Sequence, residues 1–284
     1  SKKWRELCTG GLPALRHLEL TAGRTPGSKA NLARAAHLRH LALHSYTGPH
    51  ETCPGLRTLR TVTLTTPVAD VQPLLDTCPE LIHLYGVRIF PARPASRVLD
   101  ITHARLQDVE VQGGRGVQLR LHTPELLRLQ LRGHMTLVGA YPPKLTCLDV
   151  KYFPPLGIPR SLKELLILHS HHTPTFAVAD LPELLTLHLP GMYGCNLDLR
   201  NLPRLRKLIC GYSGHIQLPD VPHLVHLALP YAASIGTVRP LQHVQTLACQ
   251  VPVPCNLPRN VTLYGGGGGM GVARASAELV LVGH

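Results

Sequence analysis

The sequence predicts a repeat solenoid of stacked, short parallel strands rather than a single compact core. The first observation is a recurring apolar pattern, clearest in residues 181–229, which reads LPELLTLHL, LPRLRKLIC and VPHLVHLAL. The second is its period of about 20 residues, which is typical of a solenoid. The third is composition, because hydrophobic residues make up 44% of the 284 residues and aromatic residues only 4%. The interior must therefore be aliphatic, chiefly leucine.

The repeated kernel is an apolar residue, two others, a second apolar residue, one other and a third apolar residue. Leu187 and Leu189 are two apart, so in a strand they point to one face while His188 points to the other. One such strand cannot bury its inner face alone, but stacked neighbours can. The first kernel positions are Leu15, Leu38, Leu59, Leu84, Leu106, Leu126, Leu145, Leu162, Leu184, Leu205, Leu224 and Val244, and degenerate copies follow at Val261/Leu263 and Leu279/Leu281.

The two ends differ from the repeats. Residues 1–8 read SKKWRELC, which predicts a short capping helix within residues 1–10. Residues 11–284 then form an irregular solenoid of about 12–14 repeats. The glycine-rich stretch 265–271 is expected to be a loop, because such a run cannot pack.

The connections between kernels change in character along the chain. Before Leu84 they are long, and residues 31–36 and 68–75 favour short helices on the outer side. After Leu126 they are short and rich in proline, which lacks the amide donor that a helix interior needs. We therefore expect short helices on the outer side of the solenoid in the first third of the chain, and mostly extended or irregular convex segments later.

The kernel resembles that of the leucine-rich repeat family over nearly the whole chain. Residues 52–56 (TCPGL) and 77–81 (TCPEL) resemble the cysteine-bearing repeats of F-box proteins. Trp4, Arg5 and Leu7 resemble the last turns of an F-box, although the same residues suit a simple capping helix. The resemblance implies an α/β leucine-rich-repeat solenoid with a parallel β-sheet on its concave face, and a Skp-type adaptor bound through an upstream region. The asparagine that many leucine-rich repeats place after the kernel is missing here.

Charge and cysteine content bear on partners and location. The formal net charge of +12 favours acidic partners, nucleic acid or anionic surfaces, although the charge is scattered. No signal peptide or membrane-length apolar stretch is visible, so no membrane partner is expected. Cys210 and Cys249 fall at kernel positions and are expected to be buried thiols, which suits an intracellular location, cytoplasmic or nuclear.

No motif for chemistry is evident in the sequence. The histidines of residues 169–172 have no acidic or cysteine ligand close in sequence and suit an exposed turn, so no metal site is expected. The glycine run lacks the strand–helix context of a phosphate cradle. No nucleophile, base and acid share a motif. We expect no catalytic residue, no cofactor and no enzyme.

The side chains between the second and third apolar kernel residues should form a column on the concave face. The column is polar at first and becomes largely apolar from Leu166 onward. A contiguous exposed apolar surface usually marks a contact site, although another segment or a subunit could cover it. The predicted partner-binding residues are Arg88, Glu110, Gln130 and Asp149 for polar specificity, and Leu166, Leu168, His188 and Ile209 for apolar contact.

These observations predict a non-catalytic protein–protein interaction scaffold. The resemblance makes substrate recognition for an F-box ubiquitin ligase its most specific form, and a structural subunit of a larger assembly is a second form. The alternative is an RNA-associated basic repeat protein. That alternative depends on the net charge and on Arg88, Arg128, Arg132, Lys151, Arg206 and Lys207. The scarcity of aromatic residues argues against recognition of single strands.

Overall fold

The computed structural model describes residues 16–21, 37–44, 54–65, 67, 70–89, 97–152, 157–169, 175–191, 196–211, 215–218, 221–230, 234–237, 243–249, 262–264 and 272–274. Contacts divide the chain into two compact units, residues 1–145 (unit 1) and residues 146–284 (unit 2). Each unit is a solenoid of parallel strands.

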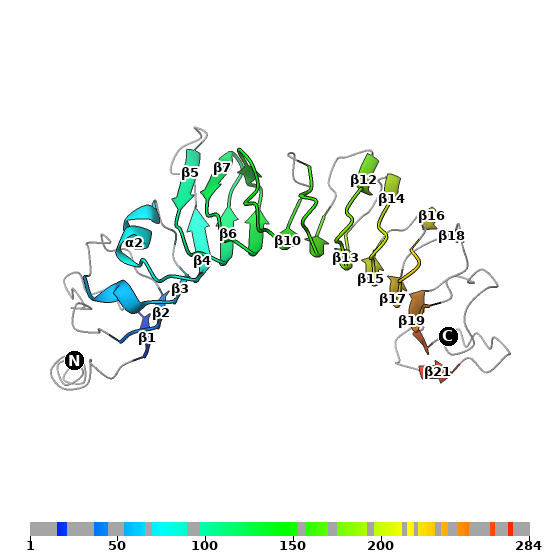
Figure 1. Ribbon diagram of the computed structural model, residues 1–284, viewed down its shortest axis with the longest axis horizontal. Helices are drawn as coiled ribbons and strands as arrows, with labels where there is room; N and C mark the ends of the chain where they lie inside the picture. Colours follow the sequence, from blue (N-terminus) through cyan, green and yellow to red (C-terminus); the bar gives the residue numbers. More distant parts are fainter. Residues whose placement is uncertain are drawn as a thin grey trace. The chain divides into compact units, whose positions relative to one another are not determined.

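Unit 1 has an inner and an outer row of strands. The inner sheet is parallel, in the order β1 (His17–Thr21), β2 (His40–His44), β3 (Thr61–Leu64), β4 (His83–Ile89), β6 (Asp108–Gly113) and β8 (Arg128–Gly133). The outer sheet is β5 (Arg97–Thr102), β7 (Val117–His122) and β9 (Thr136–Leu137). The described helices are the 3-10 helix η4 (Pro54–Thr58) and α2 (Gln72–Thr77), both outside the inner sheet (Figure 1).

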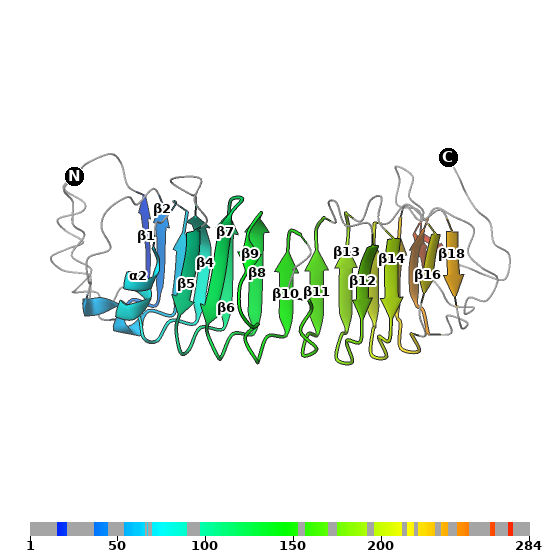
Figure 2. The same cartoon turned by 90° about the horizontal axis from the view of Figure 1, so that it is seen from above.

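Unit 2 repeats this arrangement. Its inner sheet runs β10 (Cys147–Val150), β11 (Glu164–Ile167), β13 (Thr186–Leu189), β15 (Lys207–Cys210), β17 (His226–Leu229), β19 (Thr246–Cys249) and β20 (Thr262–Tyr264), and β21 (Val272–Arg274) joins β20 antiparallel. The outer pairs are β12 (Thr175–Ala179) with β14 (Asn196–Arg200), and β16 (His215–Leu218) with β18 (Ser234–Thr237). Figure 2 shows successive strands side by side within each unit.

The kernel leucines form the core between the two rows. In β13, Leu187 and Leu189 are fully buried while His188 between them is only half-buried, as the alternating pattern predicts. Full burial of one such side chain contributes about 1.5–3 kcal/mol. In each unit the other face of the inner sheet is covered by no described element, and we call it the open face (Figure 1). The prediction of a repeat solenoid is confirmed.

A short turn leads into most kernels. In unit 2 the amide of Leu184 donates to the carbonyl oxygen of Leu181 at 3.2 Å, and the amide of Leu205 donates to that of Leu202 at 3.2 Å. Proline follows Leu181 and Leu202, and its fixed φ suits the second position of such a turn. All four leucines are buried, so the turn places a second leucine per repeat in the core.

The predicted register of the fourth repeat is wrong. Its first kernel residue is Leu81, not Leu84, because the Leu81 amide closes the turn onto the Cys78 carbonyl oxygen at 3.0 Å, and Leu84 pairs with Val62 as the second kernel residue. The register then shifts between Leu84 and Val87. Gly86, which lies in this bulge, has φ +67°, and a Cβ there would lie 2.2 Å from the Leu64 carbonyl oxygen. Glycine is therefore required.

The outer side agrees with the prediction only in part. Regular outer strands begin at β5, after the first third, where extended or irregular convex segments were expected. The six-residue α2 overlaps the predicted helical segment 68–75 at residues 72–75, but an outer layer of helices in the first third is not confirmed. The outer strands are regular because their residues carry a second alternating apolar pattern, seen in the buried Leu99 and Ile101 of β5.

Several predicted features lie outside the described residues. These are the capping helix within residues 1–10, the helix over residues 31–36 and the loop at residues 265–271. Cys210 is fully buried, as predicted. The part of the chain that the structure describes contains no helix long and apolar enough to cross a membrane.

Candidate protein-binding face

The open face of unit 2 carries one continuous column of side chains, which we call the central column. Strand register places Asp149 beside Leu166, Leu166 beside His188, and His188 beside Ile209. Ile209 then lies beside Ala228, which pairs with Ala248. The structure therefore brings together the predicted residues Asp149, Leu166, His188 and Ile209 on neighbouring strands.

Burial along the central column shows how much of it a partner can reach. Asp149 is 8% exposed, whereas Leu166, His188 and Ile209 are half-buried. Side chains on a sheet face that no second layer covers are half-buried, because the side chains of neighbouring strands cover them only from the sides. Apolar atoms of Leu166 and Ile209 thus remain accessible on both sides of His188.

A second apolar feature, which we call the end row, borders the central column. It consists of the residues that directly follow β11, β13, β15 and β17, namely Leu168, Pro190, Gly211 and Pro230. The chain is tightly packed here, since a Cβ on Gly211 would lie 1.9 Å from the Pro190 carbonyl oxygen. Leu168 was predicted as a contact residue, and its amide donates to the Val150 carbonyl oxygen at 3.0 Å. The prolines were missed, although their recurrence after the kernel is visible in the sequence.

His188 contributes to the apolar character of this face. Burial lowers the pKa of its imidazole, and the neighbouring Lys207 lowers it further, while Asp149 acts in the opposite direction. The ring is therefore neutral near pH 7. A neutral imidazole is less costly to remove from water than a charged one, so it does not interrupt the apolar stripe between Leu166 and Ile209.

Charged and polar groups line the opposite border of the central column. Lys207 and Arg206 are exposed, as is Glu164, whose carboxylate accepts from the Cys147 thiol at 3.5 Å. Next along this border, His226 and Thr246 are joined by a 2.5 Å hydrogen bond between Nδ1 and Oγ1. The open face of unit 2 thus has an apolar centre with a polar rim on one side, an arrangement found in protein–protein interfaces.

The remaining predicted contact residues lie on unit 1, and one of them is out of register. Glu110 and Gln130 pair directly between β6 and β8, as predicted. Arg88 is not in their column, because the bulge in β4 places it opposite Gln112. Tyr85 takes the expected place of Arg88 and pairs with Thr63. The prediction that Arg88 extends this column is therefore wrong, because it assumed an unbroken strand.

Sequence reasoning also missed a polar cluster on the open face of unit 1. The Tyr85 hydroxyl donates to Asp108 Oδ2 at 2.8 Å, and the His83 ring stacks on the Tyr85 ring with centroids 5.9 Å apart. Burial, followed by this hydrogen bond, raises the pKa of Tyr85 to about 12. The cluster has no signal in the sequence, because Tyr85 and Asp108 meet only through strand pairing.

Metal-binding chemistry is not assembled in the described part of either unit. No group of three or more His, Cys, Asp or Glu side chains there could hold a metal ion. Of the histidines in residues 169–172, only His169 is described, and its ring lies 6.1 Å from that of Tyr152.

No protein-family model, curated protein or solved structure matches this chain. The function is therefore argued from the geometry of the faces themselves.

Proposed function

We propose that this chain is a non-catalytic scaffold that binds a protein partner on the open face of unit 2. The observation that carries the proposal is the in-register stripe of Leu166, His188, Ile209 and Ala228 on adjacent strands, none of which is covered by a described element. The end row widens this stripe with further apolar residues. A contiguous apolar surface of this kind is typical of a protein contact site.

The mechanism is presentation of a rigid surface. The strands beneath the central column are fixed by parallel backbone pairing and by fully buried leucines such as Leu187 and Leu208. A partner that docks an apolar ridge on Leu166 and Ile209 therefore orders little of the scaffold, which lowers the entropic cost of binding. Lys207 and Glu164 at the border provide polar contacts that orient the partner.

The finer version of the proposal is a leucine-rich-repeat protein that recognises substrates for an F-box ubiquitin ligase. It is supported by the kernel spacing and by residues 77–81, whose Cys78 is fully buried, as a structural cysteine of such a repeat would be. In this version a Skp-type adaptor binds the F-box and the location is intracellular. A structural subunit of a larger assembly would use the same face.

The test is affinity purification from cells that express the tagged chain, with variants on and off the face. Leu166→Asp/Ile209→Asp places two carboxylates in the central column, and the fold should survive because both side chains are only half-buried. The matched control is Ala177→Asp/His223→Asp, at two exposed positions away from the central column. We expect a partner that the wild type and the control retain and the first variant loses at least about tenfold. Equal recovery with all three proteins would contradict the proposal.

Nucleic acid is the second candidate ligand, favoured by the exposed Arg206 and Lys207 beside the stripe. From Asp149 to Ala248 the central column has no Phe, Tyr or Trp on which bases could stack, and Tyr264, which pairs with Ala248, is the next residue in register. Titration with RNA at several salt concentrations distinguishes the two ligands, because phosphate contacts give a steep salt dependence. Tight binding of RNA that Arg206→Gln/Lys207→Gln abolishes would favour this candidate.

A further inference from the structure

Unit 1 carries three arginines on consecutive turns, which we call the arginine ladder. Arg16, Arg39 and Arg60 each directly precede an inner strand, and all three are exposed. The Arg39 amide donates to the Arg16 carbonyl oxygen at 2.9 Å, and the Arg60 amide donates to that of Arg39 at 2.9 Å. Their backbones are thus stacked directly, at the strand spacing of about 4.8 Å.

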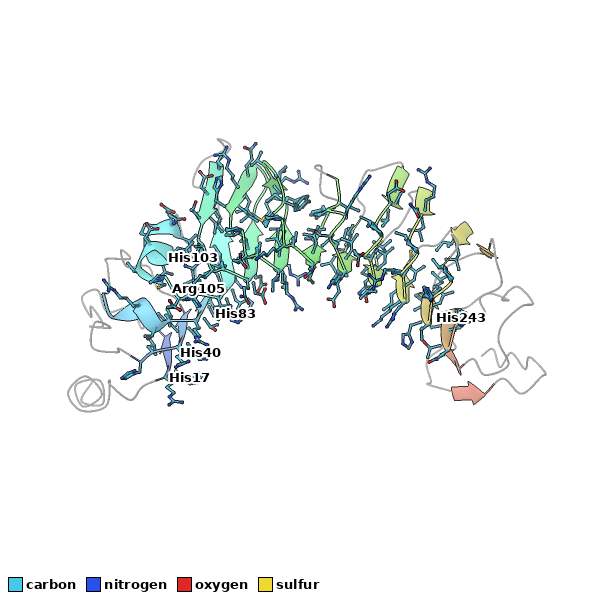
Figure 3. All side chains as sticks on the ribbon, in the orientation of Figure 1. His17, His40, His83, His103, Arg105 and His243 are labelled. Atoms are coloured by element: carbon cyan, nitrogen blue, oxygen red, sulfur yellow. The ribbon has the colours of Figure 1, made fainter. Side chains whose placement is uncertain are left out.

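Two histidines extend the ladder along the strands. His17 and His40 follow Arg16 and Arg39 and pair with each other in register. Their rings stack with centroids 4.3 Å apart and an angle of 1° between the planes, on the open side of the sheet (Figure 3). The His40 amide also donates to the Arg16 carbonyl oxygen, at 3.0 Å, so one oxygen fixes both residues of the second turn. The donor groups are therefore held on a rigid backbone.

Several cations elsewhere in the described solenoid pair with a carboxylate of the preceding turn. These pairs are Arg105 with Glu80, Arg120 with Asp100 at 3.2 Å, Lys144 with Glu125 at 2.7 Å, and Arg204 with Glu183 at 2.5 Å. Arg16, Arg39 and Arg60 instead follow one another on adjacent turns, and no ion pair joins any of them to a carboxylate among the described residues. Like charges directly opposite each other on adjacent strands are destabilising. A bound anion would offset the repulsion among cations stacked in this way.

We propose that the arginine ladder binds an acidic, extended segment of a partner protein through the carboxylates of that segment. The proposal is independent of the unit 2 face, because it uses other residues and another ligand chemistry. Guanidinium groups pair with carboxylates through two parallel hydrogen bonds, which makes arginine the suitable cation for this task.

The size of the ladder favours a peptide over nucleic acid. Three turns span two strand spacings, roughly 10 Å, which suits two or three carboxylates. His17 and His40 are stacked on each other, so neither offers a free platform on both faces for a base.

Fluorescence anisotropy with the full chain tests this assignment. The probes are a labelled peptide of about twelve glutamates, a glutamine peptide of the same length and an oligouridylate of the same length, at low and at physiological salt. The test variant is Arg39→Gln/Arg60→Gln. The control is Arg115→Gln/Arg160→Gln, which removes the same charge from two exposed arginines outside the ladder. Circular dichroism confirms folding, and Arg16→Gln alone replaces the test variant if the latter unfolds.

We expect the glutamate peptide, and not the glutamine peptide, to bind the wild type. Binding should weaken about five- to tenfold in Arg39→Gln/Arg60→Gln and less than about twofold in the control, as two exposed ion pairs would give. No binding to the wild type, or an equal loss in both variants, would overturn the proposal. So would tighter binding of the oligouridylate through the same arginines. Leu166→Asp/Ile209→Asp should leave binding of the glutamate peptide intact. The proposal for the arginine ladder can therefore fail or succeed separately from the proposal for the open face of unit 2.

Discussion

The imidazole of His103 links the carbonyl oxygen of Cys78 to the backbone of Arg105. The Arg105 amide donates to Nδ1 at 3.2 Å, so the proton of the neutral ring must lie on Nε2, which donates to the Cys78 oxygen at 3.0 Å. Cys78 caps the end of α2, and His103 directly follows β5, so one side chain joins the helix to the outer row (Figure 3). Both ring nitrogens are used only when the ring is neutral.

The first prediction concerns the pH dependence of this link. Burial lowers the pKa of His103 below its ordinary 6.5, and the hydrogen bond to Cys78 opposes this only in part. The unfolded chain therefore binds more protons, so stability is fully present above pH 6.5 and falls as pH drops through the window below it. His103→Gln should reduce the unfolding free energy by about 1–2 kcal/mol near pH 7.5 and by less near pH 5.5. Urea unfolding of both proteins at both pH values measures this, and a difference that does not change with pH would contradict it.

The second prediction concerns the bulge at Gly86. Alanine there would adopt a left-handed φ and place its Cβ 2.2 Å from a backbone oxygen, so Gly86→Ala should cost about 2–4 kcal/mol. Gly139 is the matched control, because its φ of +88° is also left-handed but a Cβ there meets nothing within 4 Å. Gly139→Ala should cost only about 1 kcal/mol. Thermal or chemical unfolding compares the two variants, and equal costs would show that the close approach to Leu64 is not limiting.

The same bulge shows where sequence reasoning stops. Leu84, Val87 and Ile89 satisfy all three kernel positions, whereas the register that starts at Leu81 has Leu84 second and Gly86 third, yet Leu81, Leu84, Val87 and Ile89 are all buried. Periodicity cannot choose between two registers that both bury their leucines. The choice depends on the turn from Leu81 to Cys78 and on the left-handed Gly86, which are properties of the backbone.

Elsewhere the kernel was sufficient to predict the central column. Leu166, His188 and Ile209 lie on adjacent strands as predicted, because a strict alternation leaves one register for each strand. The outer strands were predicted only as extended or irregular segments, because the alternation of residues such as Leu119 and Leu121 was not recognised as a second repeated pattern. The arginine ladder was missed because its members lie two positions before the second kernel residue. Only the column between the second and third kernel residues was considered as a binding surface.

The third prediction tests the alternation within the unit 2 strands. Leu187 is fully buried, so Leu187→Ala should reduce the unfolding free energy by about 2–5 kcal/mol through lost burial and a residual cavity. Leu166, on the open face of the neighbouring strand, is half-buried, and Leu166→Ala should cost about 1 kcal/mol or less. Urea unfolding measures both values. A larger cost at Leu166 would mean that this face packs against another part of the protein.

The fourth prediction concerns two tyrosine hydroxyls with opposite roles in unit 1. The Tyr85 hydroxyl donates to Asp108 Oδ2, while Asp108 Oδ1 is buried and has no hydrogen-bond partner among the described residues. Tyr85→Phe would remove the hydroxyl that satisfies this carboxylate and should cost about 1–3 kcal/mol, since a hydrogen bond to a charged group is lost. The hydroxyl of Tyr141 is also buried, and burial raises its pKa, but it has no partner among the described residues. Tyr141→Phe should therefore be neutral or stabilising.

Chemical unfolding at pH 7 compares the two variants, which remove the same atom from the same side chain. Because both substitutions delete only a hydroxyl, differences in ring packing cancel and the comparison isolates the hydrogen bond. A pH series adds a second check, because the pKa of Tyr85 is raised from 10.0 to about 12, so its contribution should be lost as pH rises above 10.0. Equal stability of Tyr85→Phe and the wild type, or a loss at Tyr141→Phe as large as at Tyr85→Phe, would show that Asp108 is satisfied in another way.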